Sequence, residues 1–337
     1  MRNKQIDGLR GFTILLIVIF HLFCRYREIY CGYTIWYLKW LGMFGNCVFL
    51  LISSYFLIGV LGKRTSIKKF IIKKVFRLWP CYIVAITLTM VFTHIFKLPY
   101  RTCSWKEYFI NVFFINGFIE SNYVDGAHWY LTTLIGAIIV VWVIKNFKID
   151  NYVWTYLVWI LLEGITGVVG LGALNKILGS SYVAVICIGI AISIMEQKSY
   201  KIKCLYKITG AKRYLRTNQW LILVVVCIVY HLFRNGVLAM FCLCLAIPFF
   251  LATLCKKGEI FERKFFEFMG KISYPLYLIH QNIAYTIEYT ISKQYIQISL
   301  NIIAGGAFLL VIVVGIVLYY FIEKPSQRMI QNCKLLK

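Results

Sequence analysis

Long apolar stretches separated by short polar segments make up almost the whole chain. Each stretch is close to the roughly 20 residues that an α-helix needs to cross a bilayer. We expect about ten of them, at residues 12–24, 41–62, 78–97, 128–145, 152–172, 178–195, 219–234, 236–254, 272–291 and 299–322. The pattern predicts an all-α integral membrane protein, a polytopic bundle that forms a single domain over residues 1–337, with no additional soluble domain.

Composition and charge support this class of protein. Hydrophobic residues make up 61% of the chain and the mean hydropathy is +0.74, which excludes a single water-soluble core. The net charge of +24 could indicate nucleic-acid binding, but Lys and Arg concentrate in alternate loops, and residues 63–77 and 196–218 hold seven each. This distribution follows the positive-inside rule with both termini cytoplasmic. We therefore expect contact with the lipid bilayer and no nucleic-acid partner.

The twelve cysteines lie mostly within apolar stretches, where they behave as small apolar side chains. No Cys-x-x-Cys or Cys/His group has the spacing of metal ligands, so no metal site is expected. The sequence leaves open whether Cys31 and Cys103, both on the predicted outer side, form a disulfide.

The first apolar stretch carries ionisable side chains where a membrane helix normally has none. Arg10 and His21 are eleven residues apart, which places them on one helix face with about 16 Å of rise between them. Asp7 falls near the same face. A titratable group in hydrocarbon costs roughly 2.5–3.5 kcal/mol on insertion scales, so we interpret this face as functional and turned toward a cavity.

Other polar residues are candidates for a second part of the site. Lys73, Lys74 and Arg77 share a face of an amphipathic segment, where they would hold a phosphate group or a lipid headgroup. Ser273, Tyr277 and His280 are spaced to share one face of a later helix, which suggests a lined cavity. Ser53, His128 and Trp129 either line the same path or serve packing and the membrane interface. Glu163, within an apolar run, needs a partner or a cavity.

Taken together, these segments resemble the membrane-bound acyltransferase 3 family. The resemblance rests on motifs that occur in order between residues 7 and 325: Arg10-x10-His21, Val48–Tyr55, Phe70-x-x-Lys73-Lys74-x-x-Arg77-x-x-Pro80, Trp129-x-Leu131, Ser273-Tyr274-x-x-Tyr277-Leu278-x-His280 and Glu323-x-Pro325. The chain departs from the family pattern in having Ser54 where Gly is usual and Lys at 73 and 74 where Arg is usual. Leu134 stands where many members have Glu, so no role for that carboxylate is carried over.

The resemblance implies an O-acetyltransferase of bacterial cell-surface glycans in the plasma (inner) membrane, crossing it many times. The donor would be cytoplasmic acyl-CoA, most simply acetyl-CoA, with no permanently bound cofactor. The acceptor would be a hydroxyl of a sugar in a polysaccharide or glycolipid. The catalytic residues would be His21, Arg10 and Asp7. His21 would be the general base, the pantetheine arm of the donor would enter near Arg10, and Asp7 would hold Arg10 in place. Acyl-CoA phosphates would bind to Lys73, Lys74 and Arg77, while the acceptor side would be lined by Ser53, His128, Trp129, Ser273, Tyr277 and His280.

Two alternatives remain open at this point. The spans and their buried polar groups also suit a transporter or flippase of glycolipid or polysaccharide precursors, although no internal duplication is visible. A glycan polymerase or ligase is the other, but the predicted outer loops are short apart from residues 98–127. The sequence also leaves open the acceptor sugar, the acyl chain, the oligomeric state, and whether transfer is direct or passes through an acyl-enzyme.

Overall fold

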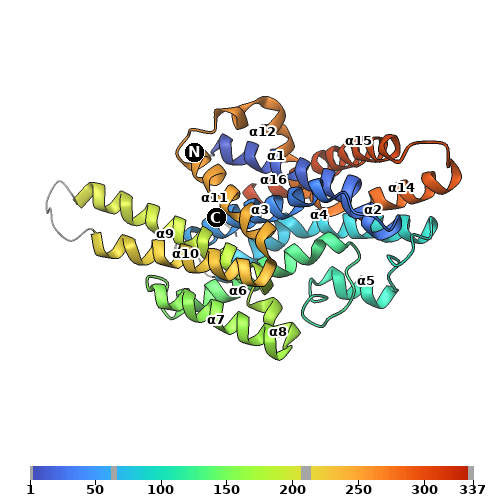
Figure 1. The fold of residues 1–337 in the computed structure, drawn as a ribbon. Helices are drawn as coiled ribbons and strands as arrows, with labels where there is room; N and C mark the ends of the chain where they lie inside the picture. The colour runs from blue at the N-terminus through green and yellow to red at the C-terminus, as the bar shows by residue number, and fades with distance from the viewer. Residues whose placement is uncertain (1–2, 62–66, 206–213, 333–337) are drawn as a thin grey trace. The chain divides into compact units, whose positions relative to one another are not determined.

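The computed structural model describes residues 3–61, 67–205 and 214–332, and in these ranges the only regular elements are helices (Figure 1). The α-helices are α1 Lys4–Phe20, α2 Tyr26–Tyr30, α3 Lys39–Leu61, α4 Ile67–Ile95, α5 Trp105–Val112, α6 Trp129–Asn146, α7 Val153–Val169, α8 Gly172–Ile177, α9 Val183–Leu205, α10 Tyr214–Asn235, α11 Val237–Leu254, α12 Lys264–Lys271, α13 Ser273–Ile279, α14 Asn282–Gln294, α15 Leu300–Leu318 and α16 Lys324–Asn332. Short π-helical segments follow α1 (His21–Arg25) and α15 (Tyr319–Glu323), and 3-10 turns cover Trp36–Leu38, Gly126–His128, Ser180–Tyr182 and Glu259–Glu262.

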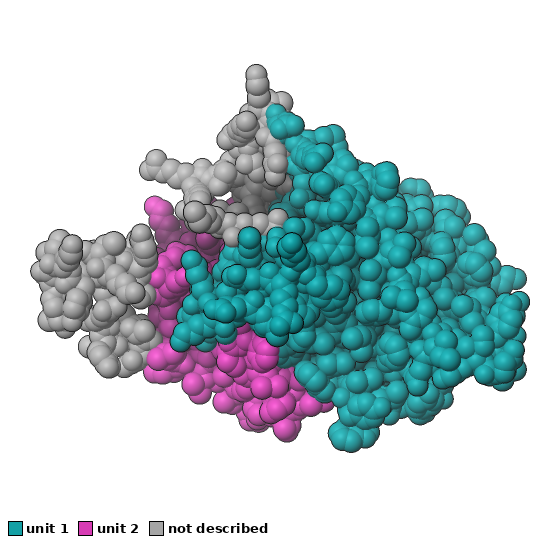
Figure 2. Space-filling model, turned by 90° about the horizontal axis from the view of Figure 1, so that it is seen from above, with its two compact units in different colours: residues 1–46, 68–130, 251–337 teal, residues 47–67, 131–250 magenta. Residues whose placement is uncertain are grey.

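The chain divides into two compact units, which Figure 2 shows in different colours. Unit 1 comprises residues 1–46, 68–130 and 251–337. Unit 2 comprises residues 47–67 and 131–250. Both units are assembled from segments far apart in the sequence, as expected when helices pack by the match of their faces rather than by their order in the chain.

Seven helices of the described residues are long and apolar enough to cross a membrane. The all-α membrane class is therefore confirmed, whereas the predicted number of about ten spans is not. Two predicted spans are shorter apolar helices, Val153–Val169 and Gln219–Asn235. The predicted span 272–291 is not one helix, because α13 ends at Ile279 and α14 begins at Asn282.

Glycines allow α1 to touch α12 backbone to backbone in unit 1. A Cβ atom on Gly11 would lie 2.0 Å from the carbonyl oxygen of Phe266, and one on Gly270 would lie 2.0 Å from that of Asp7. The small residues of α3 serve the same purpose, since a Cβ on Gly45 would lie 2.4 Å from the side chain of Ile17. These contacts fix α1 on two sides.

Residues 98–127 do not form a free loop but fold back along α4. A capping box of Ser104 and Glu107 starts α5, and the hydrogen bonds from Ser104 hold the pKa of the Glu107 carboxyl below its usual value. Along the adjacent helix α4, the Tyr82 hydroxyl donates to the carbonyl oxygen of Asn111 at 3.1 Å and the Trp79 indole donates to that of Val112 at 2.9 Å. The returning segment therefore carries residues 124–128 into the interior of unit 1.

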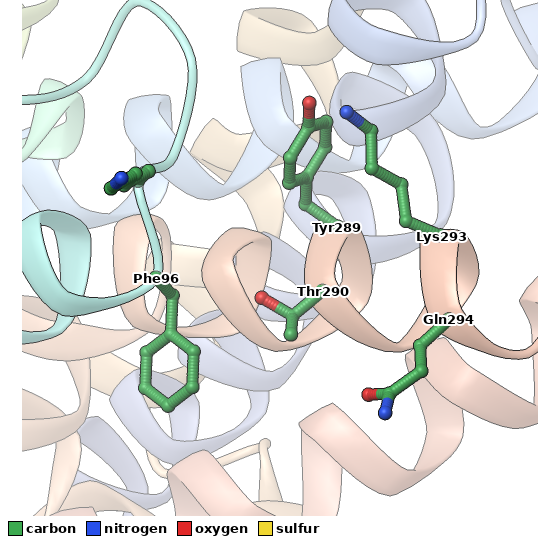
Figure 3. A pocket seen from close by; sticks show the side chains of 6 residues that line it. Phe96, Tyr289, Thr290, Lys293 and Gln294 are labelled. Carbon is green, nitrogen blue, oxygen red and sulfur yellow. The ribbon is translucent and has the colours of Figure 1, made fainter.

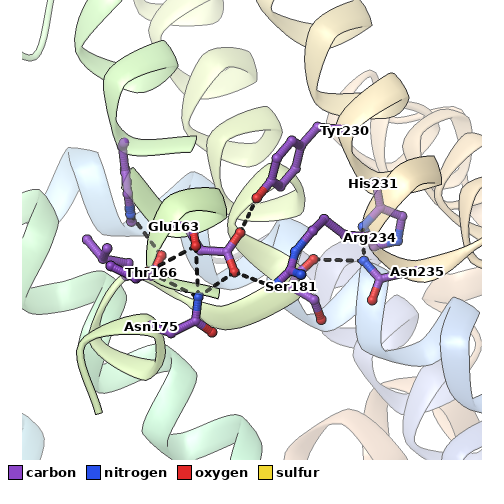
Figure 4. A network of polar contacts seen from close by, with 10 residues as sticks. Glu163, Thr166, Asn175, Ser181, Tyr230, His231, Arg234 and Asn235 are labelled. Atoms are coloured by element: carbon purple, nitrogen blue, oxygen red, sulfur yellow. Dashed lines mark hydrogen bonds and ion pairs between the residues drawn. The ribbon is translucent and has the colours of Figure 1, made fainter. Parts of the chain in front are cut away.

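Unit 2 contains a buried polar network around Glu163 of α7 (Figure 4). The Glu163 side chain is fully buried and pairs through Oε1 with Nη2 of Arg234 on α10 at 2.9 Å. The same oxygen accepts a hydrogen bond from Asn175 at 2.8 Å, and the other oxygen accepts one from the Tyr230 hydroxyl. The expectation that Glu163 has a partner is confirmed.

The glycine contact between α1 and α12 can be tested with Gly11→Ala. The added methyl group must displace backbone atoms, and such overpacking costs roughly 1–3 kcal/mol. We expect a clearly lower Tm of the detergent-solubilised protein. Gly305→Ala on α15 is the matched control, because nothing lies within 4 Å of that position. Equal Tm values for the two variants would contradict the close contact.

Candidate active site

Two histidines from opposite ends of the chain meet inside unit 1. His21 begins the π-helical segment after α1, and His280 lies at the break between α13 and α14. Their ring centroids are 4.9 Å apart with the rings steeply inclined to each other. The structure therefore brings together two residues that the sequence had placed in separate groups. A local π-helix is frequent at functional sites.

His21 is held by a tyrosine from α14. Its Nδ1 atom lies 3.1 Å from the Tyr285 hydroxyl. Tyr285 is fully buried, and its ring packs against those of Tyr26 and Tyr30 at centroid distances of 5.5 and 5.9 Å. This contact fixes the orientation of the His21 ring and leaves Nε2 as the nitrogen available to a substrate.

Hydrogen bonds to carbonyl oxygens define the tautomers of two further histidines of the site, His280 and His128. Nδ1 of His280 lies 2.8 Å from the Tyr277 carbonyl oxygen, so it must carry the proton and donate it. Nε2 of His280 is buried and has no hydrogen-bond partner among the described residues. His128 has the reverse arrangement, with Nε2 donating to the Leu278 carbonyl oxygen at 3.0 Å. The buried ring nitrogens left over are acceptors for a proton or a hydroxyl group.

The break beside His280 is held by one carboxylate. Asp125 is fully buried, and one of its oxygens accepts the N–H of Asn282 at 2.9 Å while the other accepts that of Ala127 at 2.9 Å. The Asn282 side chain adds a hydrogen bond to the Val124 carbonyl oxygen at 2.8 Å. Asp125 thus accepts hydrogen bonds from backbone N–H groups at the start of α14 and of the turn before α6, which have no partner within their own helices.

Several residues predicted to line the acceptor side gather around α13. The Tyr277 hydroxyl donates to the Ala127 carbonyl oxygen at 2.5 Å, and the Tyr277 ring lies 6.1 Å from that of His128. His128 is 1% exposed, which excludes a lipid-facing position in an aromatic belt. Ser273 instead donates to the Gly270 carbonyl oxygen at 2.8 Å where α12 meets α13. Trp129 follows directly in α6, with its ring 6.2 Å from that of Tyr130.

The predicted basic residues are Arg10 on α1 and Lys74 and Arg77 on α4, and they lie toward the end of α1 that is opposite His21. Arg10 Nη1 is 3.7 Å from the Asp7 carboxylate, as the spacing of the two residues suggested. Arg10 and Arg77 both act electrostatically on Lys74, so these three cations form one group. The side chain of Lys73 lies outside the described residues. Ser53 belongs to unit 2, and its assignment stays a prediction, as do the roles of all these residues.

Three residues of the site were missing from the sequence-based assignment. They are Arg101, Asp125 and Tyr285. On an unbroken helix Tyr285 would face about 140° away from His280, and the break between α13 and α14 removes this separation. A Cβ on Gly126 would lie 2.8 Å from the Arg101 guanidinium, and Arg101 acts electrostatically on His21. In the segment around Gly126, the acidic residue Asp125 was the only visible sign of a site in the sequence.

Both predicted outer cysteines, Cys31 and Cys103, have free thiols. Among the described residues, no group of three or more His, Cys, Asp or Glu side chains is arranged to hold a metal ion.

Comparison with known proteins identifies the class. A family model described as an acyltransferase domain matches residues 3–321. The chain belongs to the acyltransferase 3 family and is an acyltransferase, with several helices suited to a multi-pass membrane protein. No curated protein and no solved structure matches the chain.

The role of the Asp125 carboxylate can be tested with Asp125→Ala. Each hydrogen bond to a charged group is worth roughly 1.5–3 kcal/mol, so we expect a markedly lower Tm. Asp150→Ala removes a carboxylate that pairs with Lys145 at 2.7 Å and is partly exposed. That control should cost about 1 kcal/mol or less. Similar losses in both variants would show that Asp125 has no special structural role.

Proposed function

We propose that this acyltransferase moves an acetyl group from cytoplasmic acetyl-CoA to a sugar hydroxyl of a cell-surface polysaccharide or glycolipid. Bacterial glycan O-acetylation at the plasma membrane is the setting that the family resemblance implies. The observation that carries the proposal is the contact of His21 with Tyr285 and His280. The family assignment favours transfer over the alternative of a transporter or flippase.

The His21–Tyr285 pair supports general base catalysis. When Nδ1–H of His21 donates to the Tyr285 oxygen, Nε2 carries the lone pair that accepts a proton. The sugar oxygen attacks the thioester carbonyl, its proton moves to His21 Nε2, and the C–S bond breaks to release the CoA thiolate. His21 then returns the proton to the thiolate. A positioned base of this kind contributes roughly 10²–10⁴ in rate.

Arg10, Lys74 and Arg77 support the assignment of the donor end. Arg10 and Arg77 act electrostatically on Lys74, and the carboxylates of Asp7 beside Arg10 and of Glu323 near Arg77 compensate only part of this positive charge. The remaining positive charge attracts the phosphates of acyl-CoA. Arg10 and His21 are separated by about 16 Å along the helix. The long pantetheine arm would span this distance, with the nucleotide end at the cations and the thioester near His21.

The general base is tested with His21→Ala. We expect transfer from radiolabelled acetyl-CoA by the purified protein in vesicles to fall roughly 10²–10⁴-fold, while the protein still folds and inserts. His94→Ala is the control, because His94 is exposed and its Nδ1 donates a hydrogen bond to the Met90 carbonyl oxygen of its own helix. Near-normal acetylation by a folded His21→Ala protein would remove this residue from the mechanism.

The donor site is tested with Arg77→Gln. Loss of one phosphate contact should raise KM for acetyl-CoA about tenfold, which corresponds to roughly 1.4 kcal/mol, and leave kcat nearly unchanged. Acetyl-dephospho-CoA lacks the 3′-phosphate, so its KM should respond less if Arg77 binds that group. Lys256→Gln, at an exposed lysine, is the charge-matched control. A rise in KM of the same size for both variants would argue for a general charge effect.

A further inference from the structure

Acyl transfer at His21 creates a negative charge that the base itself does not stabilise. When the sugar oxygen attacks the thioester carbon, the electron pair of the C=O bond moves onto the carbonyl oxygen. Enzymes that transfer acyl groups stabilise this oxygen with N–H or O–H donors that are already in place. His280 offers only an acceptor, since its Nδ1 proton is donated to a carbonyl oxygen, and Tyr285 contacts the Nδ1 side of the His21 ring, away from Nε2. Suitable donors lie instead around Gly126.

Arg101 and Gln281 converge on Gly126, the first residue of the turn before α6. A Cβ on Gly126 would lie 2.8 Å from Nη1 of Arg101 and 3.0 Å from Nε2 of Gln281. Both nitrogens are N–H donors. Gln281 directly follows His280, whose ring centroid is 4.9 Å from that of His21. Because Gly126 has no side chain, a guanidinium and an amide come together next to the histidine pair.

The aromatic cluster that holds His21 also holds Arg101. The Tyr30 hydroxyl accepts a hydrogen bond from the Arg101 guanidinium and donates one to the Pro99 carbonyl oxygen at 3.2 Å. The Tyr30 ring packs 5.9 Å from that of Tyr285, whose hydroxyl contacts His21. Arg101 also acts electrostatically on both Tyr285 and His21. One packed group of rings therefore fixes the guanidinium relative to the base.

Neither donor group is neutralised or saturated by the protein. Within the described ranges Arg101 forms no ion pair with a carboxylate. Gln281 is only 4% exposed, yet its side chain makes no hydrogen bond to another described residue, and its Oε1 is buried without a partner. A buried amide in this state costs free energy. Such a cost is typical of a group whose partner is the substrate.

We propose that Arg101 and the side-chain amide of Gln281 bind the acyl carbonyl oxygen and stabilise the negative charge that it gains during transfer. This role rests on the proposed function and adds the groups that face the oxygen to the base that faces the hydroxyl. The oxygen holds the electron pair until the C=O bond re-forms and the C–S bond breaks, and the thiolate then takes the proton from His21. Arg101 stays protonated throughout and acts through its charge and its forked N–H donors.

The role of Arg101 is tested with Arg101→Gln. Release of CoA from acetyl-CoA by the purified protein is measured with methyl glucoside, a neutral sugar, as acceptor. We expect kcat to fall roughly 10²–10³-fold and KM for acetyl-CoA to stay nearly unchanged, because the charge exists only in the transition state. Arg101→Lys keeps the charge without the forked donors and should recover part of the rate. An unchanged kcat for Arg101→Gln would overturn the proposal.

Gly126→Ala tests the position of the two donors while leaving both residues in the chain. The added methyl group meets only the ends of the Arg101 and Gln281 side chains, and Gly126 does not have a positive φ. The fold should therefore persist, whereas kcat should fall because both donors are displaced. Gly305→Ala is the matched control, since nothing lies within 4 Å of that position. Equal kcat values for the two variants would contradict the proposed position.

Two other cations control for a general effect of charge. Arg25 acts on His21 more strongly than Arg101 does, but it pairs with Glu28. Lys97 lies on the same segment as Arg101 and lines the cavity at the end of α14, which none of the residues assigned to the active site lines (Figure 3). Arg25→Gln and Lys97→Gln should keep kcat close to that of the wild type. A loss in either as large as that of Arg101→Gln would overturn the proposal.

A binding measurement separates this role from the proposed function. S-carboxymethyl-CoA and S-acetonyl-CoA undergo no transfer and carry a carboxylate or a neutral ketone close to the position of the acyl oxygen. We expect the detergent-solubilised wild type to bind the anionic analogue about tenfold more tightly, Arg101→Gln to lose this preference, and Arg25→Gln to keep it. If no preference depends on Arg101, the proposal is wrong whatever the rate of transfer.

Two further outcomes identify the source of a failure. If Arg101→Gln impairs transfer to methyl glucuronide but not to methyl glucoside, Arg101 binds a charge on the acceptor and the proposal is wrong. If the wild type consumes no acetyl-CoA but shows the preference that depends on Arg101, the proposed function fails, while the binding site for a negatively charged oxygen beside His21 is supported.

Discussion

The geometry of the histidine pair depends on the carboxylate of Asp125. A helix broken in the middle of a protein exposes backbone N–H groups that water cannot reach. Asp125 accepts one such group at the start of α14 and another ahead of α6. Because the break follows His280 directly, the same two hydrogen bonds determine where this imidazole lies. The returning segment after α5 therefore has a structural task at the centre of unit 1.

The sequence predicted the class of the protein, and the contact between Asp7 and Arg10 follows from their spacing. Apolar length alone predicted membrane helices, and the spacing of Asp7, Arg10 and His21 predicted their common face. The predicted span 272–291, by contrast, is two helices, α13 and α14. The break coincides with the polar residues 280–282, but it is stabilised by Asp125, which is more than 150 residues away in sequence.

The sequence analysis missed Arg101, Asp125 and Tyr285 for the same physical reason, namely that contacts between distant segments position them. Helical periodicity predicts neighbours only within an unbroken helix, so it could not bring Tyr285 to His21 or Arg101 to Gly126. Tertiary contacts between distant segments make those pairs. Conversely, residues that meet within one helix, such as Asp7 and Arg10, were predictable from their spacing.

The network around Glu163 bears on how unit 2 is made. Glu163 and Arg234 are 71 positions apart, so α7 is synthesised well before the residue that neutralises its carboxylate. Until α10 emerges, α7 carries an uncompensated acidic group that disfavours stable burial in hydrocarbon. Biogenesis of this unit therefore requires that α7 be sheltered, protonated or held at the translocon until the later helix arrives, and the order of synthesis becomes part of the assembly pathway.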